Sequence, residues 1–416
     1  MSKRRVVVTG MGCVTPYGIG IDNFWNNIKN GKSGIKEHNL DKEKHLVKVA
    51  GQVPVDINVE KYIDSKEAKR LDKSIIYALI AAEEAYTDSG LDLEKEDRTR
   101  IGVIVSTAAG GLVVVTTGYK EMMNRGFHKC SPFTVPMMIA NMASGKISIK
   151  FGLRGPSKAV LSACATGAHS VGDSYRTIQC GDADIMFAGG AESSVCDFGI
   201  GAFTSARTLS KSDRAPEEVS RPYDKDRDGF VLSEGGAVLI LEEREHAIKR
   251  GAKIYAELTG YGQSSDAYDM VAPDPEGKGA ELAIRNCLKE ADKSPKDVDY
   301  INMHGTSTHL GDLAESKTVE RVFGNKKTNS NLLVSSTKSM TGHMLGAAGS
   351  AEAIVAVKTI VEGIVPPTIN LINIDPEVAD LDYVANKARA KDVKVALSNS
   401  FGFGGHNAVL MFEKAQ

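Results

Sequence analysis

The chain has 416 residues, of which 42% are hydrophobic and 25% charged, a composition typical of a globular protein with a large core. Its 51 basic and 53 acidic side chains give a net charge of −2, which excludes a general attraction to nucleic acid or to an anionic membrane. No apolar stretch approaches the length of a membrane span. From the charge and the hydropathy together, we expect neither nucleic acid nor membrane as a partner.

The basic start, Met1–Arg5, leads directly into an apolar segment without a signal-peptide core, which predicts a cytoplasmic protein. The cysteines are scattered, with no CxxC pair and no His/Cys cluster at the spacing of metal ligands. The sequence therefore indicates neither a disulfide framework nor a metal site.

A buried strand is predicted over Arg5–Thr9, ending in a turn at Gly10–Gly12. The glycines invite a dinucleotide-binding interpretation, but no third glycine opens a helix as the GxGxxG fingerprint requires. A long helix is predicted over Lys73–Ser89 with Gly90 as its stop, followed by a strand over Ile101–Val105.

Cys164 follows an apolar run, Ala159–Leu161, and precedes residues at helical spacing, Ala168, Val171, Tyr175 and Ile178. This pattern predicts a buried strand, a turn, and a helix whose N-terminus points at the sulfur. Free N–H groups and the positive end of the helix dipole favour a thiolate there, and any oxyanion beside it. Cys164 is therefore a candidate nucleophile, although most cysteines are simply small buried hydrophobes.

The second half of the chain repeats this plan. Its segments match the strands, the long helix and the turn of the first half in the same order: Tyr255–Gly262, Gly279–Ala291, Asp299–Gly305, Leu332–Ser336 and Gly346–Ala351. We interpret this as an internal duplication with halves 1–254 and 255–416. Alternating strands and helices predict an α/β fold with predominantly parallel sheets covered on both faces.

Duplication brings equivalent turns together, so the turn that ends at His343 is predicted to face Cys164. His304 directly follows an apolar strand, where α/β proteins place ligands. Either histidine alone is more often structural, but together with Cys164 they supply the hydrogen-bonding groups that a nucleophile needs. Lys338 lies in the same turn, and we expect Glu315 to pair with it, because an unpaired buried ammonium is costly.

Glycines alternate with aromatic residues in Ser398–Asn407, which predicts an irregular loop. A plain hairpin corner is one interpretation. The other is a mobile gate in which the backbone N–H of Phe401 completes an oxyanion hole with that of Cys164.

Together these motifs resemble those of the β-ketoacyl-acyl carrier protein synthases, the condensing enzymes of fatty acid synthesis, and most closely the type II synthases. The matching segments cover nearly the whole chain: Val8–Gly12, Gly155–Pro156, Ala163–Gly167, Arg227–Phe230, His304–Thr308, Lys338–His343 and Gly402–Asn407. The resemblance implies an acyltransferase with a thiolase fold, five layers αβαβα, working as a homodimer.

The resemblance also implies roles. Cys164 takes the acyl group from acyl carrier protein as a thioester, and the backbone N–H groups of Cys164 and Phe401 hold the oxyanion. His304 and His343 hydrogen-bond the thioester carbonyl of malonyl carrier protein and stabilise the enolate formed as carbon dioxide leaves. The carbanion then attacks the acyl-cysteine and releases a β-ketoacyl thioester two carbons longer.

By the same resemblance, Lys338 organises the site with Glu315, and Thr306 and Thr308 hold the phosphopantetheine arm. No separate cofactor is implied, because phosphopantetheine arrives on the carrier protein. The chemistry fits the residues independently: decarboxylation generates a carbanion without a strong base, so the site needs stabilisers of negative oxygen more than a proton acceptor.

Three positions depart from the family pattern. His309 stands where proline is usual, which affects loop stiffness or the nearby field, and Ser233 replaces a frequent glycine with little expected effect. Ala109 stands where a larger apolar residue commonly lines the acyl pocket, so its methyl group is expected to lengthen that pocket. The remaining pocket and gate residues are expected to be Phe401, Gly402 and Phe403.

Acyl carrier protein is acidic, and basic side chains offer a patch for it at Lys66, Lys69, Arg70 and Arg207. A solvated face of mixed charge is the alternative, because Asp64 and Glu67 are interspersed.

Other functions are weighed against this one. A thiolase or a type III synthase primed by coenzyme A pairs the cysteine with His and Asn, or with His and a second Cys, so two histidines speak against both. A noncatalytic chain-length partner subunit lacks the nucleophile that Cys164 supplies. A cysteine hydrolase needs water near the acyl-enzyme, whereas a gate suggests that water is excluded.

Overall fold

The computed structural model describes residues 4–41 and 43–415, so Met1–Lys3 of the basic start lie outside it. The first half contains these elements, with η for a 3₁₀ helix: β1 (Val6–Thr15), β2 (Gly18–Ile19), α1 (Ile21–Lys29), β3 (Lys36–Glu37), β4 (Val49–Ala50), η1 (Val59–Lys61), α2 (Ser65–Ala68), α3 (Lys73–Ser89), η2 (Arg98–Arg100), β5 (Ile101–Ser106), α4 (Leu112–Arg125), α5 (Thr134–Met138), α6 (Met142–Phe151), η3 (Ala163–Ala165), α7 (Thr166–Gln179), β6 (Ile185–Glu192), α8 (Asp197–Ser205), α9 (Pro216–Val219), β7 (Gly235–Glu243) and α10 (Arg244–Lys249).

The second half contains β8 (Ala256–Ser265), α11 (Lys278–Glu290), η4 (Pro295–Asp297), β9 (Tyr300–Asn302), α12 (His309–Phe323), β10 (Leu333–Ser335), α13 (Lys338–Thr341), η5 (Leu345–Ala347), α14 (Ala348–Glu362), β11 (Ile364–Val365), β12 (Arg389–Ala390), β13 (Val395–Gly402) and β14 (His406–Glu413). The predicted long helix is confirmed as α3, and Gly90 ends it in the left-handed conformation, with φ of 61°.

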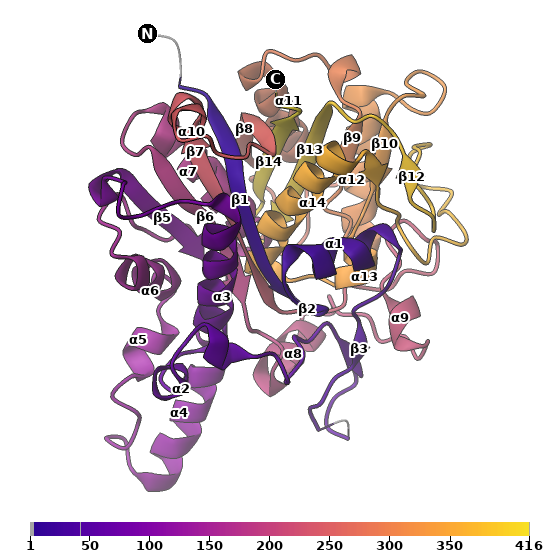
Figure 1. The fold of residues 1–416 in the computed structure, drawn as a ribbon. Helices are drawn as coiled ribbons and strands as arrows, with labels where there is room; N and C mark the ends of the chain where they lie inside the picture. The colour runs from indigo at the N-terminus through magenta and orange to yellow at the C-terminus, as the bar shows by residue number, and fades with distance from the viewer. Residues whose placement is uncertain (1–3, 42, 416) are drawn as a thin grey trace.

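The main sheet follows the order β10-β9-β13-β14-β8-β1-β7-β6-β5, with β2 paired to β1 off this path (Figure 1). β3–β4 and β11–β12 form separate pairs. β8 and β1 pair antiparallel over a short stretch at Val6–Val8. The order is nearly symmetric about this junction, with five strands on the β8 side and four on the β1 side. The counterpart of β10 is the segment at Ser157, which forms only an isolated bridge to Val103 of β5. Each half therefore contributes a sheet of its own, and the short pairing joins the two sheets at one edge. This symmetry is the structural form of the duplication seen in the sequence.

The sheets are mixed, so the prediction of predominantly parallel strands is wrong. β5–β6, β9–β13 and β9–β10 are parallel, whereas β1–β7, β6–β7, β8–β14 and β13–β14 are antiparallel. Periodicity indicates which segments are strands, but it does not indicate which strands pair in the sheet. β13 and β14 are consecutive in the chain and pair directly, which makes them antiparallel.

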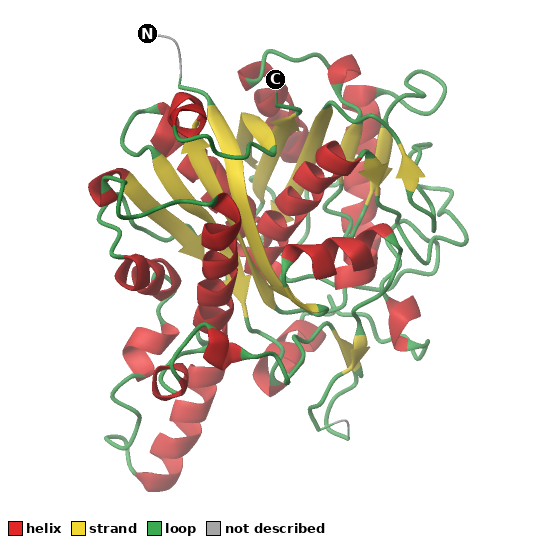
Figure 2. Cartoon of the chain, viewed as in Figure 1, coloured by secondary structure: helices red, strands yellow, loops and turns green. Residues whose placement is uncertain are grey.

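Helices form three layers around the two sheets, which gives the predicted five-layer αβαβα arrangement (Figure 2). α3 packs on the outer face of the first sheet and α11 on the outer face of the second, while α7 and α14 pack against each other between them. Every residue of α14 from 348 to 360 is buried. The many small residues in α7 and α14 allow this close central packing.

Glycines in the first strand of each half permit the outer helix to approach. The predicted turn at Gly10 and Gly12 is wrong, because β1 continues through both positions to Thr15, with a shift in its register against β7 between Val8 and Gly10. A Cβ atom on Gly12 would lie 2.2 Å from the Ala81 carbonyl oxygen of α3, and one on Gly262 of β8 would lie 1.9 Å from that of Ala283 in α11. Both glycines are therefore packing positions.

The segment before Cys164 is not the predicted buried strand. Val160 is half-buried, Leu161 is 54% exposed, and the preceding chain only forms an isolated bridge between Ser157 and Val103 of β5. It runs along the edge of the sheet, where few ladder hydrogen bonds form. The predicted helix after Cys164 is confirmed as α7.

Equivalent left-handed turns precede the two central helices. Ala163 opens η3 with φ of 49°, and Leu345 opens η5 with φ of 44°. Cys164 therefore occupies the same position in the first half as Gly346 in the second.

The glycine-aromatic segment forms a β-hairpin, so the prediction of an irregular loop is wrong. Phe401 and Gly402 end β13 opposite Asn407 and His406 of β14. Gly404 and Gly405 of the connecting turn have φ of 81° and 74°, which glycine adopts without strain. Among the described helices, none combines the length and apolarity that crossing a membrane requires.

Candidate active site

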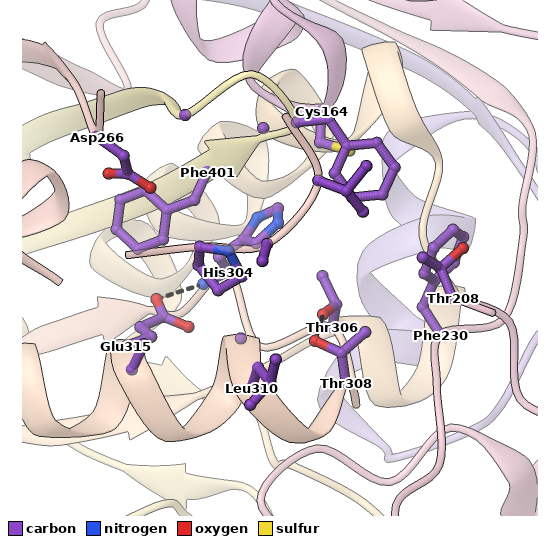
Figure 3. A pocket seen from close by; sticks show the side chains of 18 of the residues that line it. Cys164, Thr208, Phe230, Asp266, His304, Thr306, Thr308, Leu310, Glu315 and Phe401 are labelled. Carbon is purple, nitrogen blue, oxygen red and sulfur yellow. Dashed lines mark hydrogen bonds between the residues drawn. The ribbon is translucent and has the colours of Figure 1, made fainter. Parts of the chain in front are cut away.

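Cys164, His304 and His343 line one cavity of about 440 Å³, as the duplication predicted. Cys164 lies in η3, His304 directly after β9 and His343 after α13. Figure 3 shows the cysteine sulfur and His304 on facing walls of this cavity. Other predicted residues that line it are Arg207, Thr306, Thr308, Glu315, Phe401, Gly402 and Phe403.

Cys164 is 7% exposed, and its environment favours the neutral thiol. Burial raises the pKa of the thiol to about 12, while Lys338 and the backbone N–H groups of Phe403 and Cys164 itself act to lower it. The expectation of a resting thiolate is therefore wrong: desolvation outweighs the N–H groups and the nearby ammonium. Loss of the proton has to accompany attack on the incoming thioester.

The backbone N–H that faces the Cys164 sulfur from the hairpin belongs to Phe403, not to Phe401 as predicted. Phe401 lies within β13 and presents its ring to His304, with ring centroids 5.8 Å apart. Gly402 brings the hairpin close, since a Cβ atom there would lie 2.5 Å from the Ser162 carbonyl oxygen. Phe403 is the first residue after β13, so its N–H points at the sulfur. The sequence did not indicate where the strand ends and the turn begins.

The rings of His304 and His343 lie edge to face, with centroids 5.4 Å apart. Burial, and secondly the charge of Lys338, lowers the pKa of both imidazoles well below the usual range, so both are neutral. Nδ1 of His304 and both ring nitrogens of His343 are buried without a hydrogen-bond partner in the described part of the chain. The cavity thus contains hydrogen-bonding groups that a ligand can satisfy.

Glu315 of α12 fixes the loop that carries His304. Its carboxylate accepts the backbone N–H groups of His304 at 2.7 Å and Gly305 at 2.8 Å, the first of which is drawn in Figure 3. The Asn399 amide and the Tyr223 hydroxyl also donate to it, at 3.1 Å each. Burial raises the pKa of Glu315, and the donors at Gly305, His304 and Asn399 act to lower it.

Lys338 pairs with Glu352 of α14, so the predicted pair with Glu315 is wrong. Both side chains are buried, at 1% and 5% exposure, behind the cavity wall. Burial raises the pKa of Glu352 to about 7, and Lys338 acts to lower it. Sequence reasoning missed Glu352, although a carboxylate within the apolar run of α14 was a usable signal for a buried ionic partner.

Thr306 and Thr308 stand on the cavity wall with their hydroxyl oxygens 2.9 Å apart. The buried Arg227 holds the loop that carries them, because its guanidinium donates to the carbonyl oxygens of Thr308 at 3.2 Å and His309 at 2.8 Å. Arg227 also pairs with Asp375 at 2.6 Å.

The predicted basic patch falls in two places. Arg207 stands at the cavity that contains Cys164. Lys66 and Arg70 line a second cavity of about 450 Å³, and Lys69 is exposed beside them. Ala109 is exposed in the single chain and lies outside the residues that line either cavity.

Comparison with known families agrees with this geometry. The family model "Beta-ketoacyl synthase, N-terminal domain" matches residues 3–247, and "Beta-ketoacyl synthase, C-terminal domain" matches residues 255–372. Proteins named 3-oxoacyl-[acyl-carrier-protein] synthase 2 from Synechocystis sp. and Vibrio harveyi are 46% and 47% identical, each over 100% of this chain and 99% of the relative.

Solved structures are similar over the same length. One, of a type II PKS acyl-carrier protein in complex with its ketosynthase, has a TM-score of 0.91 at 34% identity and covers 100% of both chains. Another, a β-ketoacyl synthase from Burkholderia phymatum, has a TM-score of 0.91 at 32% identity, over 99% of this chain and 100% of that one. With both family domains matched in order and the cysteine and histidines in one cavity, the chain belongs to the β-ketoacyl synthase family.

Proposed function

We propose that the chain is a type II β-ketoacyl-acyl carrier protein synthase that elongates fatty acyl chains by decarboxylative condensation. The observation that carries the proposal is a buried cysteine that shares one cavity with two neutral histidines. Nδ1 of His304 and both ring nitrogens of His343 are buried without a partner among the described residues. Full-length relatives named 3-oxoacyl-[acyl-carrier-protein] synthase 2 support the same activity.

In the first half-reaction, the sulfur of Cys164 attacks the thioester carbonyl of acyl carrier protein. A new carbon–sulfur bond forms, the phosphopantetheine thiol leaves, and the Cys164 proton goes with it. The N–H groups of Cys164 and Phe403 are positioned to hold the oxyanion of this step. The arm is part of the carrier protein, so the reaction needs no separate cofactor.

In the second half-reaction, malonyl carrier protein occupies the vacated cavity. Its carboxyl carbon leaves as carbon dioxide, and the electron pair of the broken bond forms an enolate whose oxygen accepts hydrogen bonds from His304 and His343. Neutral imidazoles suit this role, because they donate an N–H without protonating the carbanion. The carbanion attacks the acyl carbonyl, and the bond to the Cys164 sulfur breaks. The departing thiolate takes up a proton from solvent, which restores the thiol.

Several further assignments belong to this proposal. Thr306 and Thr308 hold the phosphopantetheine arm. The buried charge of Lys338 acts to lower the pKa values of Cys164 and the two histidines. The carrier protein docks near Arg207, at the cavity, with Lys66, Lys69 and Arg70 as a separate candidate surface. We further infer a cytoplasmic protein whose halves meet near residue 254.

We also infer a homodimer. α4 and α5 extend from one end of the molecule (Figure 1), and α4 exposes an apolar row at Val115, Tyr119 and Met123, which are 44%, 60% and 56% exposed. A second copy would cover such a row, since monomers rarely leave large apolar surfaces in water.

The test is elongation of a ladder of acyl carrier proteins with malonyl carrier protein, with products and the enzyme read by mass spectrometry. We expect products two carbons longer and an acyl adduct on Cys164. Cys164→Ala should carry no adduct and form no product. An acyl adduct that persists in Cys164→Ala would overturn the assignment of the nucleophile.

A further inference from the structure

His309, Asp375 and Glu377 form a cluster that the proposed reaction does not use. Each offers one ligand atom, and these atoms lie within 4.8 Å of one another. His309 is distant in sequence from Asp375 and Glu377, so no spacing motif indicates the cluster. His309 also lines the cavity that contains Cys164, which places the cluster at the edge of the active site.

Asp375 is held in a fixed orientation. Its carboxylate accepts hydrogen bonds from the Arg227 guanidinium at 2.6 Å and from the Glu377 backbone N–H at 2.9 Å, one on each oxygen. Its side chain is 8% exposed. Each carboxylate oxygen carries a second lone pair, and carboxylates that bind metal ions are commonly oriented by such hydrogen bonds.

The local charge favours a cation. Asp375 and Glu377 carry negative charge against the single guanidinium of Arg227, which Asp312 also approaches, at 3.6 Å. The positive end of α12, where His309 is the first residue, opposes a cation, but this partial charge is smaller than the charge of the two carboxylates.

We propose that His309, Asp375 and Glu377 bind a divalent transition-metal cation of the zinc class at the rim of the active-site cavity. One imidazole nitrogen with two carboxylate oxygens is a donor set for Zn²⁺ or Co²⁺, with water completing the coordination. Glu377 and His309 are exposed, so their side chains are free to close on an ion. The site ties the start of α12 to the 375–377 segment.

The decisive variant is His309→Pro. His309 occupies the first helical position of α12, where proline is well tolerated because the N–H there has no partner within the helix. The substitution therefore removes the imidazole without disturbing the fold. Glu377→Gln removes the second exposed ligand and keeps the size of the side chain.

The experiment titrates Co²⁺ into the full-length protein after Cys164 has been alkylated with iodoacetamide. Alkylation removes the Cys164 thiol as a possible sulfur ligand for Co²⁺. We measure heat and visible absorption. The expected result is binding of one equivalent of Co²⁺, displaced by Zn²⁺, with an absorption spectrum that lacks a thiolate-to-cobalt charge-transfer band.

His309→Pro and Glu377→Gln should each weaken binding by about tenfold or more, in line with the loss of a ligand or its orienting group. His128→Asn, which removes another exposed histidine, serves as the matched control and should bind as the unchanged protein does. Equal affinity in His309→Pro, a thiolate band, or no uptake of Co²⁺ would each overturn the proposal.

Discussion

The ammonium of Lys338 is paired with Glu352 inside the protein, while Glu315 receives the backbone N–H groups of His304 and Gly305. The two carboxylates therefore act on different parts of the site. Glu352 balances a buried charge, and Glu315 fixes a loop.

Replacing Glu352 with alanine should destabilise the protein by about 3–5 kcal/mol, because it leaves the Lys338 charge buried and unpaired. Chemical denaturation measures this loss. The double variant Glu352→Ala/Lys338→Met is the control and should recover part of the stability. A single variant as stable as the original would contradict the pairing.

Replacing either active-site histidine should separate the two half-reactions. His304→Ala and His343→Ala are expected to slow malonyl decarboxylation by about 100-fold or more, as loss of an oxyanion donor does. Transfer of an acyl group to Cys164 should remain measurable by mass spectrometry. Equal loss of both half-reactions would argue against the division of roles.

Gly402→Ala should impair catalysis by moving the hairpin away from Cys164, without removing any reacting group. Its Cβ atom would lie 2.5 Å from the Ser162 carbonyl oxygen and 3.1 Å from the Cys164 nitrogen, so the hairpin and the nucleophile turn must separate. A displacement on the order of 1 Å costs roughly 100-fold in rate. Gly201→Ala is the control, because a Cβ atom on Gly201 meets nothing within 4 Å. Unchanged turnover in Gly402→Ala would show that this contact is not needed.

Ala109→Phe tests the expected effect on chain length. Ala109 is exposed in the single chain, so it can border an acyl pocket only where another surface, such as a second copy, covers it. On that basis the phenylalanine should shorten the longest primer accepted, read from the product lengths of the acyl carrier protein ladder. An unchanged profile would remove Ala109 from the pocket.

Glu234→Gln should change how stability depends on pH. Burial raises the pKa of Glu234 from 4.5 to about 7, so the folded state favours the protonated form. The stability this proton contributes is complete below pH 4.5 and is lost as the pH rises through about 7. Glutamine still accepts from the Tyr77 hydroxyl and the Val53 N–H.

The Glu234→Gln variant should therefore be more stable than the original protein above pH 7, by up to about 3 kcal/mol, and similar to it near pH 4.5. Denaturation at both pH values checks this. A gain of equal size at both would point to packing instead of charge.

The sequence predicted the features that depend on local pattern and on duplication. Helical periodicity located α3 and α7, and the repeated plan of the two halves placed His304 and His343 opposite Cys164. Features decided by contacts between distant segments were missed. Whether Gly12 bends the chain or admits a helix depends on Ala81, and that contact is not visible in the local sequence.

The same limit applies within the site. Glu315 and Glu352 are both buried carboxylates that could pair with Lys338. The packing of α14 decides that Glu352 is the partner. The thiol of Cys164 stands at a helix start, as predicted, but the depth of its burial decides its protonation.

The paired left-handed turns at Ala163 and Leu345 have a consequence for the chemistry of the whole chain. A side chain at Gly346, the counterpart of Cys164, would begin 2.5 Å from the Ala108 nitrogen and 3.1 Å from a carboxylate oxygen of Glu192. The second turn has no room for a reactive group. A nearly symmetric scaffold is thereby restricted to one acyl acceptor, and its other half is left to supply the groups that act on the second substrate.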